Sequence, residues 1–137
     1  MKKYFALLIM VSFIISCDTG TFNNKNPYLP NYPVNKEINL SLPQYSNLQF
    51  PSNYVLIDGG VNGIVVFNTG SGFVAFDLAC PNQELSACST MTINGINAKC
   101  PCDNAEYSLF SGQSAGLQYP MKQYRTESAG GYLYVTN

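Results

Sequence analysis

Hydrophobic residues are distributed along this chain in three different ways, and each predicts a different kind of segment. Phe5 to Ile15 is almost wholly apolar, whereas Asp18 to Pro33 is rich in Asn, Pro, Thr and Gly and has no hydrophobic period. From Val34 onward, short apolar runs are separated by Gly, Asn and Pro, which is typical of β structure. We therefore expect a targeting segment, a tether and one folded unit.

The folded unit, residues 34–137, is expected to consist of short antiparallel strands. Apolar alternation and flanking turn residues predict the strands Val34–Leu42, Asn53–Ile57, Gly63–Asn68, Phe73–Asp77, Tyr107–Phe110, Lys122–Thr126 and Tyr132–Val135. Met91–Ile96 also alternates and contains an Asn94-Gly95 turn signal. Glycine-bearing links at Asn68–Gly72 and Ser128–Gly131 predict hairpins. No segment longer than a turn is predicted to be helical, so the expected fold class is all-β.

The N-terminus has the pattern of an export signal. Lys2 and Lys3 precede the apolar segment, which is shorter than the roughly 20 residues that a membrane-spanning helix needs. Ser16-Cys17 at its end resembles a bacterial lipobox, which implies cleavage before Cys17 and acylation of that cysteine. Residues 1–16 would then be a lipoprotein signal peptide and residues 17–33 a lipidated N-terminus and flexible tether. The alternative is an ordinary secretory signal whose cysteine is incidental.

Charge and composition exclude several classes of function. The chain has 137 residues, a formal net charge of −1 and no histidine. Without histidine, neither Ser-His-Asp nor Cys-His catalysis is possible, and no enzyme activity and no catalytic residue are expected. Nucleic-acid binding needs clustered basic residues. Those after Cys17 are scattered, at Lys25, Lys36, Lys99, Lys122 and Arg125.

The cysteines carry the strongest chemical signal. There are five, and assigning Cys17 to lipid leaves Cys80, Cys88, Cys100 and Cys102. An even number in an exported chain favours disulfides. Three pairings are possible, and the one that joins Cys100 to Cys102 is disfavoured because it closes a very tight loop. The alternative is a four-cysteine zinc or 2Fe-2S site, although C-x7-C and C-x-C spacings differ from the two C-x-x-C knuckles of zinc ribbons.

Two short motifs point to a family. Cys80-Pro81-Asn82 follows the apolar segment Phe73–Asp77, and Cys100-Pro101-Cys102-Asp103 precedes Tyr107–Gln113. From about Asn53 to Thr136 the chain resembles a Rieske-type iron–sulfur domain, in which C-x-H and C-P-C-H stand at these two places. The resemblance implies a Rieske-like domain of small antiparallel sheets with two cysteine-bearing loops. It also implies the family function of electron transfer by a 2Fe-2S cluster.

The chain departs from the family at the cluster ligands. A Rieske cluster binds two cysteines through one iron and two histidines through the other. The former cluster-ligand positions here are Cys80, Asn82, Cys100 and Asp103. An amide does not replace imidazole as an iron ligand, and a carboxylate is a harder donor. We therefore expect no metal and no cofactor, with a 2Fe-2S cluster possible only through altered ligation.

The resemblance also implies how the cysteines pair. In respiratory-chain Rieske proteins the outer cysteine of the first loop is bonded to the middle cysteine of the second, which here implies Cys88–Cys102. Cys88 lies eight residues after Cys80 and not five, so the first loop carries an insertion. Without iron between them, Cys80 and Cys100 are expected to reach the Cα separation of about 5.5 Å that a disulfide needs. One disulfide with a free, redox-active dithiol is the alternative.

These observations predict a function with one alternative. We expect a membrane-anchored Rieske-like lipoprotein of the bacterial cell envelope, extracytoplasmic and without the normal cluster, that acts as a disulfide-stabilised structural or interaction module. The alternative is an envelope electron-transfer protein with a non-standard 2Fe-2S or other metal site on its cysteines. The expected partners are the membrane, through the lipid, and a protein that the sequence does not identify. The acidic residues near the loops (Asp77, Glu84, Asp103 and Glu106) indicate a solvated surface rather than a cation site.

Overall fold

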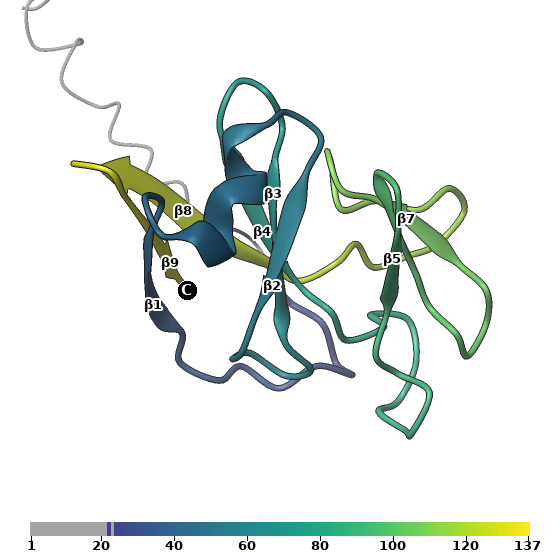
Figure 1. The fold of residues 1–137 in the computed structure, drawn as a ribbon. Coiled ribbons are helices and arrows are strands. Elements are labelled where there is room, and N and C mark those ends of the chain that lie inside the picture. The colour runs from purple at the N-terminus through teal and green to yellow at the C-terminus, as the bar shows by residue number, and fades with distance from the viewer. Residues whose placement is uncertain (1–21, 23) are drawn as a thin grey trace, which may run out of the picture.

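The computed structural model describes residue 22 and residues 24–137, so the expected signal peptide and Cys17 lie outside the described residues. The strands form a six-stranded antiparallel sheet in the order β1-β9-β8-β4-β3-β2 and a three-stranded one in the order β5-β6-β7 (Figure 1). The strands are β1 (Asn35–Asn39), β2 (Tyr54–Ile57), β3 (Ile64–Asn68), β4 (Phe73–Asp77), β5 (Thr92–Asn94), β6 (Asn97–Lys99), β7 (Glu106–Ser108), β8 (Gln123–Ala129) and β9 (Tyr132–Thr136). The expected all-β class is confirmed. No helix among the described residues is long and apolar enough to cross a membrane.

Strand β3 lies inside the larger sheet and is covered on both faces. Its residues from Ile64 to Phe67 are all fully buried. Because successive side chains of a strand point to opposite faces, they divide between two cores. Val65 and Phe67 pack in one core, and Ile64 and Val66 in the other. The continuous apolar run of β3 in the sequence therefore reflects burial on two sides.

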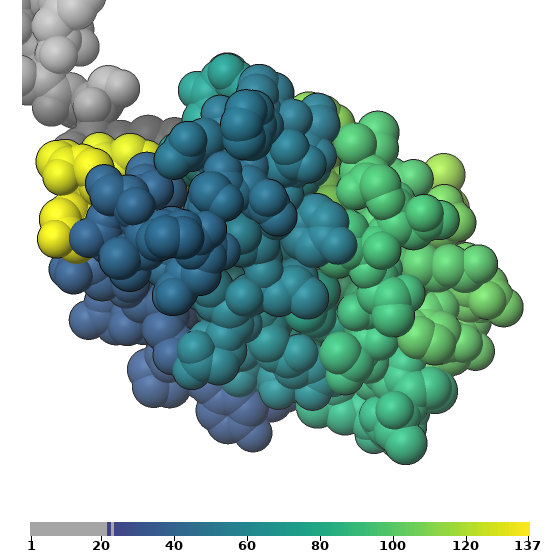
Figure 2. Space-filling model, viewed as in Figure 1, coloured from purple at the N-terminus to yellow at the C-terminus, as the bar shows by residue number. Residues whose placement is uncertain are grey.

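The two cores join different parts of the molecule. The first lies between the two sheets, and its buried members include Val65, Phe67, Phe76, Tyr107, Leu109 and Met121. The second is enclosed by the strands of the larger sheet, and its members include Ile38, Leu48, Ile64, Val66, Tyr124, Leu133 and Val135. In Figure 2 the green atoms of the smaller sheet and its loops pack directly against the teal atoms of the larger sheet. The smaller sheet is therefore held on the larger one through the first core.

The hairpin β8–β9 is longer than the sequence predicts. Gly130 and Gly131 have φ of 59° and 83°, and these positive values allow a two-residue turn directly after Ala129. Strand β8 therefore continues three residues past the expected end at Thr126. Strand β9 pairs with β8 on one side and with β1 on the other, which places β1 at the edge of the larger sheet.

One element was not predicted. Pro43–Gln49 forms a 3-10 helix, η1, so the expectation that no segment longer than a turn is helical is wrong. Only Leu48 is buried in this helix, and so there is no apolar period to detect. Pro43 occupies the first turn, where its missing N–H costs nothing. The helix contacts β2 and β3, and Leu48 enters the second core.

The packed unit begins before the expected boundary at Val34. Residues 24–33, which we call the N-terminal strap, lie against the β domain. Asn24 exchanges two hydrogen bonds with the backbone of Gln123, at 2.8 and 3.1 Å. Asn26 Nδ2 donates to the carbonyl of Pro81 at 2.7 Å. Side-chain amides make these hydrogen bonds, and Leu29 is the one buried apolar residue of the strap, so there is no hydrophobic period to detect.

Candidate functional site

Two loops carry the cysteines other than Cys17. Loop A, residues 78–91, follows β4, and loop B, residues 100–105, joins β6 to β7. Loop A is closed at its base, because the Cys80 amide donates to Ser89 O at 2.8 Å and the Met91 amide donates to Leu78 O at 2.7 Å. In loop B the amide of Asn104 donates to Cys100 O at 2.9 Å. The larger sheet therefore positions loop A, and the smaller sheet positions loop B.

Two disulfides join loop A to loop B. The inner disulfide, Cys80–Cys100, has a Cα–Cα distance of 5.7 Å, and both residues are almost fully buried. The outer disulfide, Cys88–Cys102, has a Cα–Cα distance of 5.2 Å. Cys102 is half-buried and Cys88 is exposed. These are the two pairs that the resemblance implied, so the expectation of disulfide-bonded cysteines holds in the structure.

The sulfur atoms are close together and have polar neighbours. The Sγ atoms of Cys80, Cys100 and Cys102 all lie within 4.8 Å of one another. Gln83 Nε2 donates to Cys100 Sγ at 3.3 Å. Ser86 Oγ lies 3.3 Å from Cys88 Sγ and 3.6 Å from Cys102 Sγ. A single cluster of four sulfurs therefore spans both loops, and it runs from the buried pair to the exposed Cys88.

Asn82 uses its amide to hold the chain and not to face the sulfurs. Its Nδ2 donates to Tyr119 O at 2.7 Å and to the Tyr107 hydroxyl at 2.9 Å. Its Oδ1 accepts a hydrogen bond from the Tyr119 amide at 2.9 Å. Burial raises the pKa of Tyr107, the hydrogen bond from Asn82 lowers it and the Asp103 charge raises it, with a net shift upward. Asn82 thus clamps loop A to the segment that leads into β8.

Asp103 is exposed and stabilises its own loop. Its Oδ1 accepts a hydrogen bond from the amide of Ala105 at 3.0 Å, which is a local turn contact. Of the four positions that the resemblance assigns to cluster ligands, the structure brings Cys80 and Cys100 together but engages Asn82 and Asp103 elsewhere. Because the two sulfurs are bonded to each other and the amide is fully hydrogen-bonded, this arrangement does not fit the ligand set of a Rieske 2Fe-2S cluster.

A buried carboxylate, which the sequence pattern does not distinguish from a solvated one, lies beside loop A. Asp77 is fully buried, and its Oδ2 accepts hydrogen bonds from the Val61 amide at 2.6 Å and the Tyr124 hydroxyl at 2.7 Å. Its Oδ1 accepts from the amides of Asn62 at 3.1 Å and Ala79 at 2.9 Å. We call this group the Asp77 network. Four donors satisfy the charge, which makes Asp77 a structural residue and not part of a solvated surface.

Two neighbours of the Asp77 network have shifted pKa values. Burial, followed by the hydrogen bond and the charge of Asp77, raises the pKa of Tyr124 far above its ordinary value. Lys122 is buried, and its Nζ donates to Pro30 O at 2.8 Å and to Asn31 Oδ1 at 3.0 Å. Burial lowers the pKa of Lys122, and the Asp77 charge offsets part of that shift. The only feature of the sequence that points to the Asp77 network is the position of this acidic residue at the end of the apolar strand β4.

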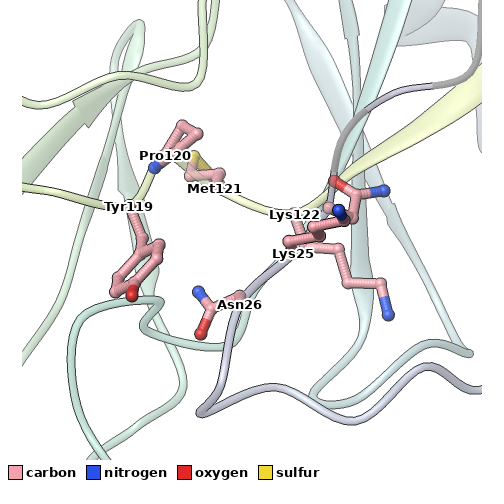
Figure 3. A pocket seen from close by; sticks show the side chains of 7 residues that line it. Lys25, Asn26, Tyr119, Pro120, Met121 and Lys122 are labelled. Atoms are coloured by element: carbon pink, nitrogen blue, oxygen red, sulfur yellow. The ribbon is translucent and has the colours of Figure 1, made fainter.

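A small cavity lies between the N-terminal strap and the segment before β8. Lys25 and Asn26 line one side, and Tyr119, Pro120 and Met121 line the other (Figure 3). Its volume is about 20 Å³, which is enough for one water molecule. Tyr28 of the strap packs edge-on against Tyr119, with 6.0 Å between the ring centroids. This cavity is too small for a cofactor or an organic substrate.

Comparisons with solved structures show the fold. The chain is similar to the quaternary ammonium Rieske monooxygenase CntA, at 18% identity and a TM-score of 0.50, over 66% of this chain and 29% of that one. It is also similar to a chain of the complex of reduced oxygenase and oxidized ferredoxin in carbazole 1,9a-dioxygenase, at 21% identity and a TM-score of 0.46 over 63% and 82%. The carbazole 1,9a-dioxygenase ferredoxin from Nocardioides aromaticivorans IC177 matches at 16% identity and 0.44 over 63% and 86%. No protein-family model matches the chain, and no curated protein matches it. These similarities show the expected Rieske-like fold, and they show nothing of the function.

Proposed function

We propose that this chain is a lipid-anchored module of the bacterial cell envelope in which two disulfides occupy the place of a Rieske cluster. Its role is structural or in protein interaction, and not electron transfer through a normal 2Fe-2S centre. One observation carries the proposal: Cys80 and Cys100 are buried and bonded to each other. The engagement of Asn82 with Tyr107 and Tyr119 supports it.

The disulfides stabilise the smaller sheet, whose short strands bury little apolar surface. Strands β5, β6 and β7 have three residues each, and strands this short bury little apolar surface. Each disulfide is expected to stabilise the fold by roughly 2–4 kcal/mol, mainly by restricting the unfolded chain. Both bridges connect loop A to loop B, so they hold together the two loops that the sheets present.

The oxidation state of the cysteines tests the proposal. The exported full chain is purified without reductant, its thiols are blocked, and its mass is measured together with iron, sulfide and zinc. We expect no label on Cys80, Cys88, Cys100 or Cys102 and no stoichiometric metal. Label on Cys80 and Cys100 together with bound iron would refute the structural role.

The lipid anchor needs a separate experiment. The proposal rests on the lipobox-like Ser16-Cys17, which follows an apolar segment. The full chain is expected to enter the detergent phase on phase partition and to carry the mass of acyl chains. A Cys17→Ala variant should enter the aqueous phase. If both variants partitioned into the aqueous phase, the anchor would be wrong, although the disulfide proposal would stand.

The register of the former ligand positions is tested by a gain of function. Asn82→His combined with Asp103→His restores two histidines in the places that the Rieske motifs assign to them. In a reducing host that assembles iron–sulfur clusters, this variant should show iron–sulfur absorbance that the parent chain lacks. A variant with Asn82→His alone is the matched control. No absorbance from the double variant would count against the register.

One observation favours a second candidate, a metal site on the cysteines. Three of the sulfurs already lie within 4.8 Å of one another, and the fourth, that of Cys88, is bonded to one of them. This site requires both disulfides to be reduced, because thiolates are the metal ligands. Zinc or iron bound stoichiometrically by the reduced chain and not by the oxidised chain, with the native fold retained, would support this candidate over the structural role.

A further inference from the structure

The sulfur of Cys102 belongs to the outer disulfide and lies close to the inner one. It is bonded to the exposed Cys88, and it lies within 4.8 Å of the sulfurs of both Cys80 and Cys100. If the bond to Cys88 opens, a small movement of the Cys102 side chain can bring its sulfur into contact with the inner disulfide. The outer disulfide is therefore placed to act on the inner one.

Access from solvent differs strongly between the two disulfides. Cys88 is exposed, whereas Cys80 and Cys100 have relative exposures of 1% and 0%. Thiol–disulfide exchange requires a thiolate to reach a sulfur, so an external thiol meets the outer disulfide first. The sulfur of Cys102 offers a path from the exposed outer disulfide to the buried pair.

We propose that the four cysteines form a thiol–disulfide relay through which an external dithiol exchanges two electrons with the buried pair. This activity goes beyond the structural role. In the first step one thiolate of the dithiol attacks Cys88 Sγ, a mixed disulfide forms, and Cys102 leaves as a thiolate. The second sulfur of the dithiol then displaces Cys88, which leaves as a thiolate and takes up a proton. The dithiol ends as a disulfide and has lost two electrons.

The second half of the relay is internal. The Cys102 thiolate attacks Cys80 Sγ, a Cys80–Cys102 disulfide forms, and the Cys80–Cys100 bond breaks. Cys100 leaves as a thiolate with the electron pair and takes up a proton. The two electrons from the dithiol thus reside in the thiols of Cys88 and Cys100. One disulfide still joins loop A to loop B, and so the fold keeps a covalent bridge throughout.

Loop closure and the hydrogen bond from Gln83 favour attack on Cys80 rather than on Cys100. Attack on Cys100 would form a disulfide with only Pro101 between its cysteines, which closes a very tight loop. Attack on Cys80 avoids this and releases Cys100, whose sulfur already accepts a hydrogen bond from Gln83 at 3.3 Å. A hydrogen bond to the charged form stabilises a thiolate. Ser86 Oγ, 3.6 Å from Cys102 Sγ, offers the same stabilisation to the attacking sulfur.

Partial reduction of the intact chain tests the relay. The oxidised protein is treated with one equivalent of dithiothreitol, quenched with acid, labelled with N-ethylmaleimide and mapped by peptide mass. The relay predicts label on Cys88 and Cys100 and a Cys80–Cys102 disulfide. Label on Cys88 and Cys102 with Cys80–Cys100 intact would overturn it, because the outer disulfide would then open without consequence. This measurement needs no variant and so does not depend on a mutant that folds.

Two variants test the route and the leaving group. Cys88→Ser with Cys102→Ser removes the entry, and reduction of Cys80–Cys100 by dithiothreitol should slow at least tenfold under native conditions. An equal rate would mean direct access and would refute the relay. Gln83→Leu should slow the labelling of Cys100 severalfold while Cys88 is labelled at the parent rate. Gln49→Leu, at an exposed glutamine of η1, is the matched control and should change neither rate.

Discussion

Different interactions stabilise the larger sheet and the smaller sheet of this protein. The larger has six strands, an inner strand, β3, buried on both faces, and a buried carboxylate with four donors. The smaller has three strands of three residues each, and it is held on the larger sheet by the first core, by two disulfides and by the hydrogen bond from Asn82 to Tyr107 of β7. The difference teaches that a sheet too short to bury its own core can be stabilised by covalent bonds and by contacts with a larger neighbour.

Removing the carboxylate of the Asp77 network should have the largest effect. Asp77→Ala leaves three amides and the Tyr124 hydroxyl without their acceptor in a buried site, so the free energy of unfolding should fall by about 3 kcal/mol or more. Chemical denaturation of the oxidised protein measures this. Glu84→Ala, at an exposed acidic residue of loop A, is the control and should have little effect. A loss in Asp77→Ala no greater than in that control would mean that the larger sheet does not depend on the network.

Removing the outer disulfide should weaken the smaller sheet first. The variant with Cys88→Ser and Cys102→Ser should lose roughly 2–4 kcal/mol of unfolding free energy, because its unfolded chain is less restricted. Native-state hydrogen exchange should show faster exchange in β5–β7 than in β3. If the amides of both sheets exchanged at the same increased rate, the sheets would unfold as one unit, and the smaller sheet would not depend on the disulfide more than the larger one does.

Removing the hydrogen bonds of Asn82 should cause the next largest loss of unfolding free energy. Asn82→Ala leaves the amide and carbonyl of Tyr119 without this partner, and also the Tyr107 hydroxyl, so the loss should be about 1–3 kcal/mol. The matched control is Asn97→Ala on β6, whose side chain makes one exposed contact with Glu106 at 3.5 Å. Equal losses in the two variants would show that the clamp contributes nothing beyond an ordinary surface amide.

Alkaline pH should lower the free energy of unfolding by the smallest amount of these changes, and mainly through a residue of the larger sheet. The fold raises the pKa of Tyr124 and, to a lesser extent, of Tyr107. Unfolded tyrosines ionise near pH 10 while these stay protonated, so the unfolded state binds fewer protons and stability falls as the pH rises above about 10. Each group can contribute up to about 1.4 kcal/mol per pH unit. Lys122, whose pKa is lowered, contributes with the opposite sign.

The variant Tyr124→Phe separates these contributions. It removes one tyrosine and leaves Tyr107 and Lys122 in place, so its unfolding free energy should fall less steeply between pH 9.5 and 11 than that of the parent chain, on the order of one group's contribution. Denaturant melts at several pH values, made quickly enough to avoid disulfide exchange, give the two slopes. Parallel slopes would mean that Tyr124 does not titrate differently in the folded and unfolded states.

Local patterns in the sequence predicted most of the strands and turns of the fold. The alternation around Val34–Leu42, the apolar run of Gly63–Asn68 and the glycines at 130 and 131 each correspond to an observed strand or turn. These signals survive because strand formation and turn geometry depend on near neighbours. Helix η1 escaped detection because a single buried leucine leaves no period to read.

The candidate site was only partly predictable. The motifs around Cys80 and Cys100 marked both loops, because cysteine spacing is visible in the chain itself. The roles of Asp77 and Asn82 were not visible, since their partners lie as far away as Tyr124 and Tyr119. A polar residue reads as exposed unless its distant partners are known, and only the fold supplies them.

By itself, the sequence determined an all-β chain, two cysteine-bearing loops and the lack of any histidine ligand. These are properties of composition and of short spacings. The tertiary structure decided that Asp77 is a buried acceptor, that Asn82 holds the chain before β8, and that the sulfur of Cys102 lies beside the inner disulfide. The physical reason is that hydrogen bonds and sulfur contacts between distant segments depend on packing in three dimensions, which no local pattern encodes.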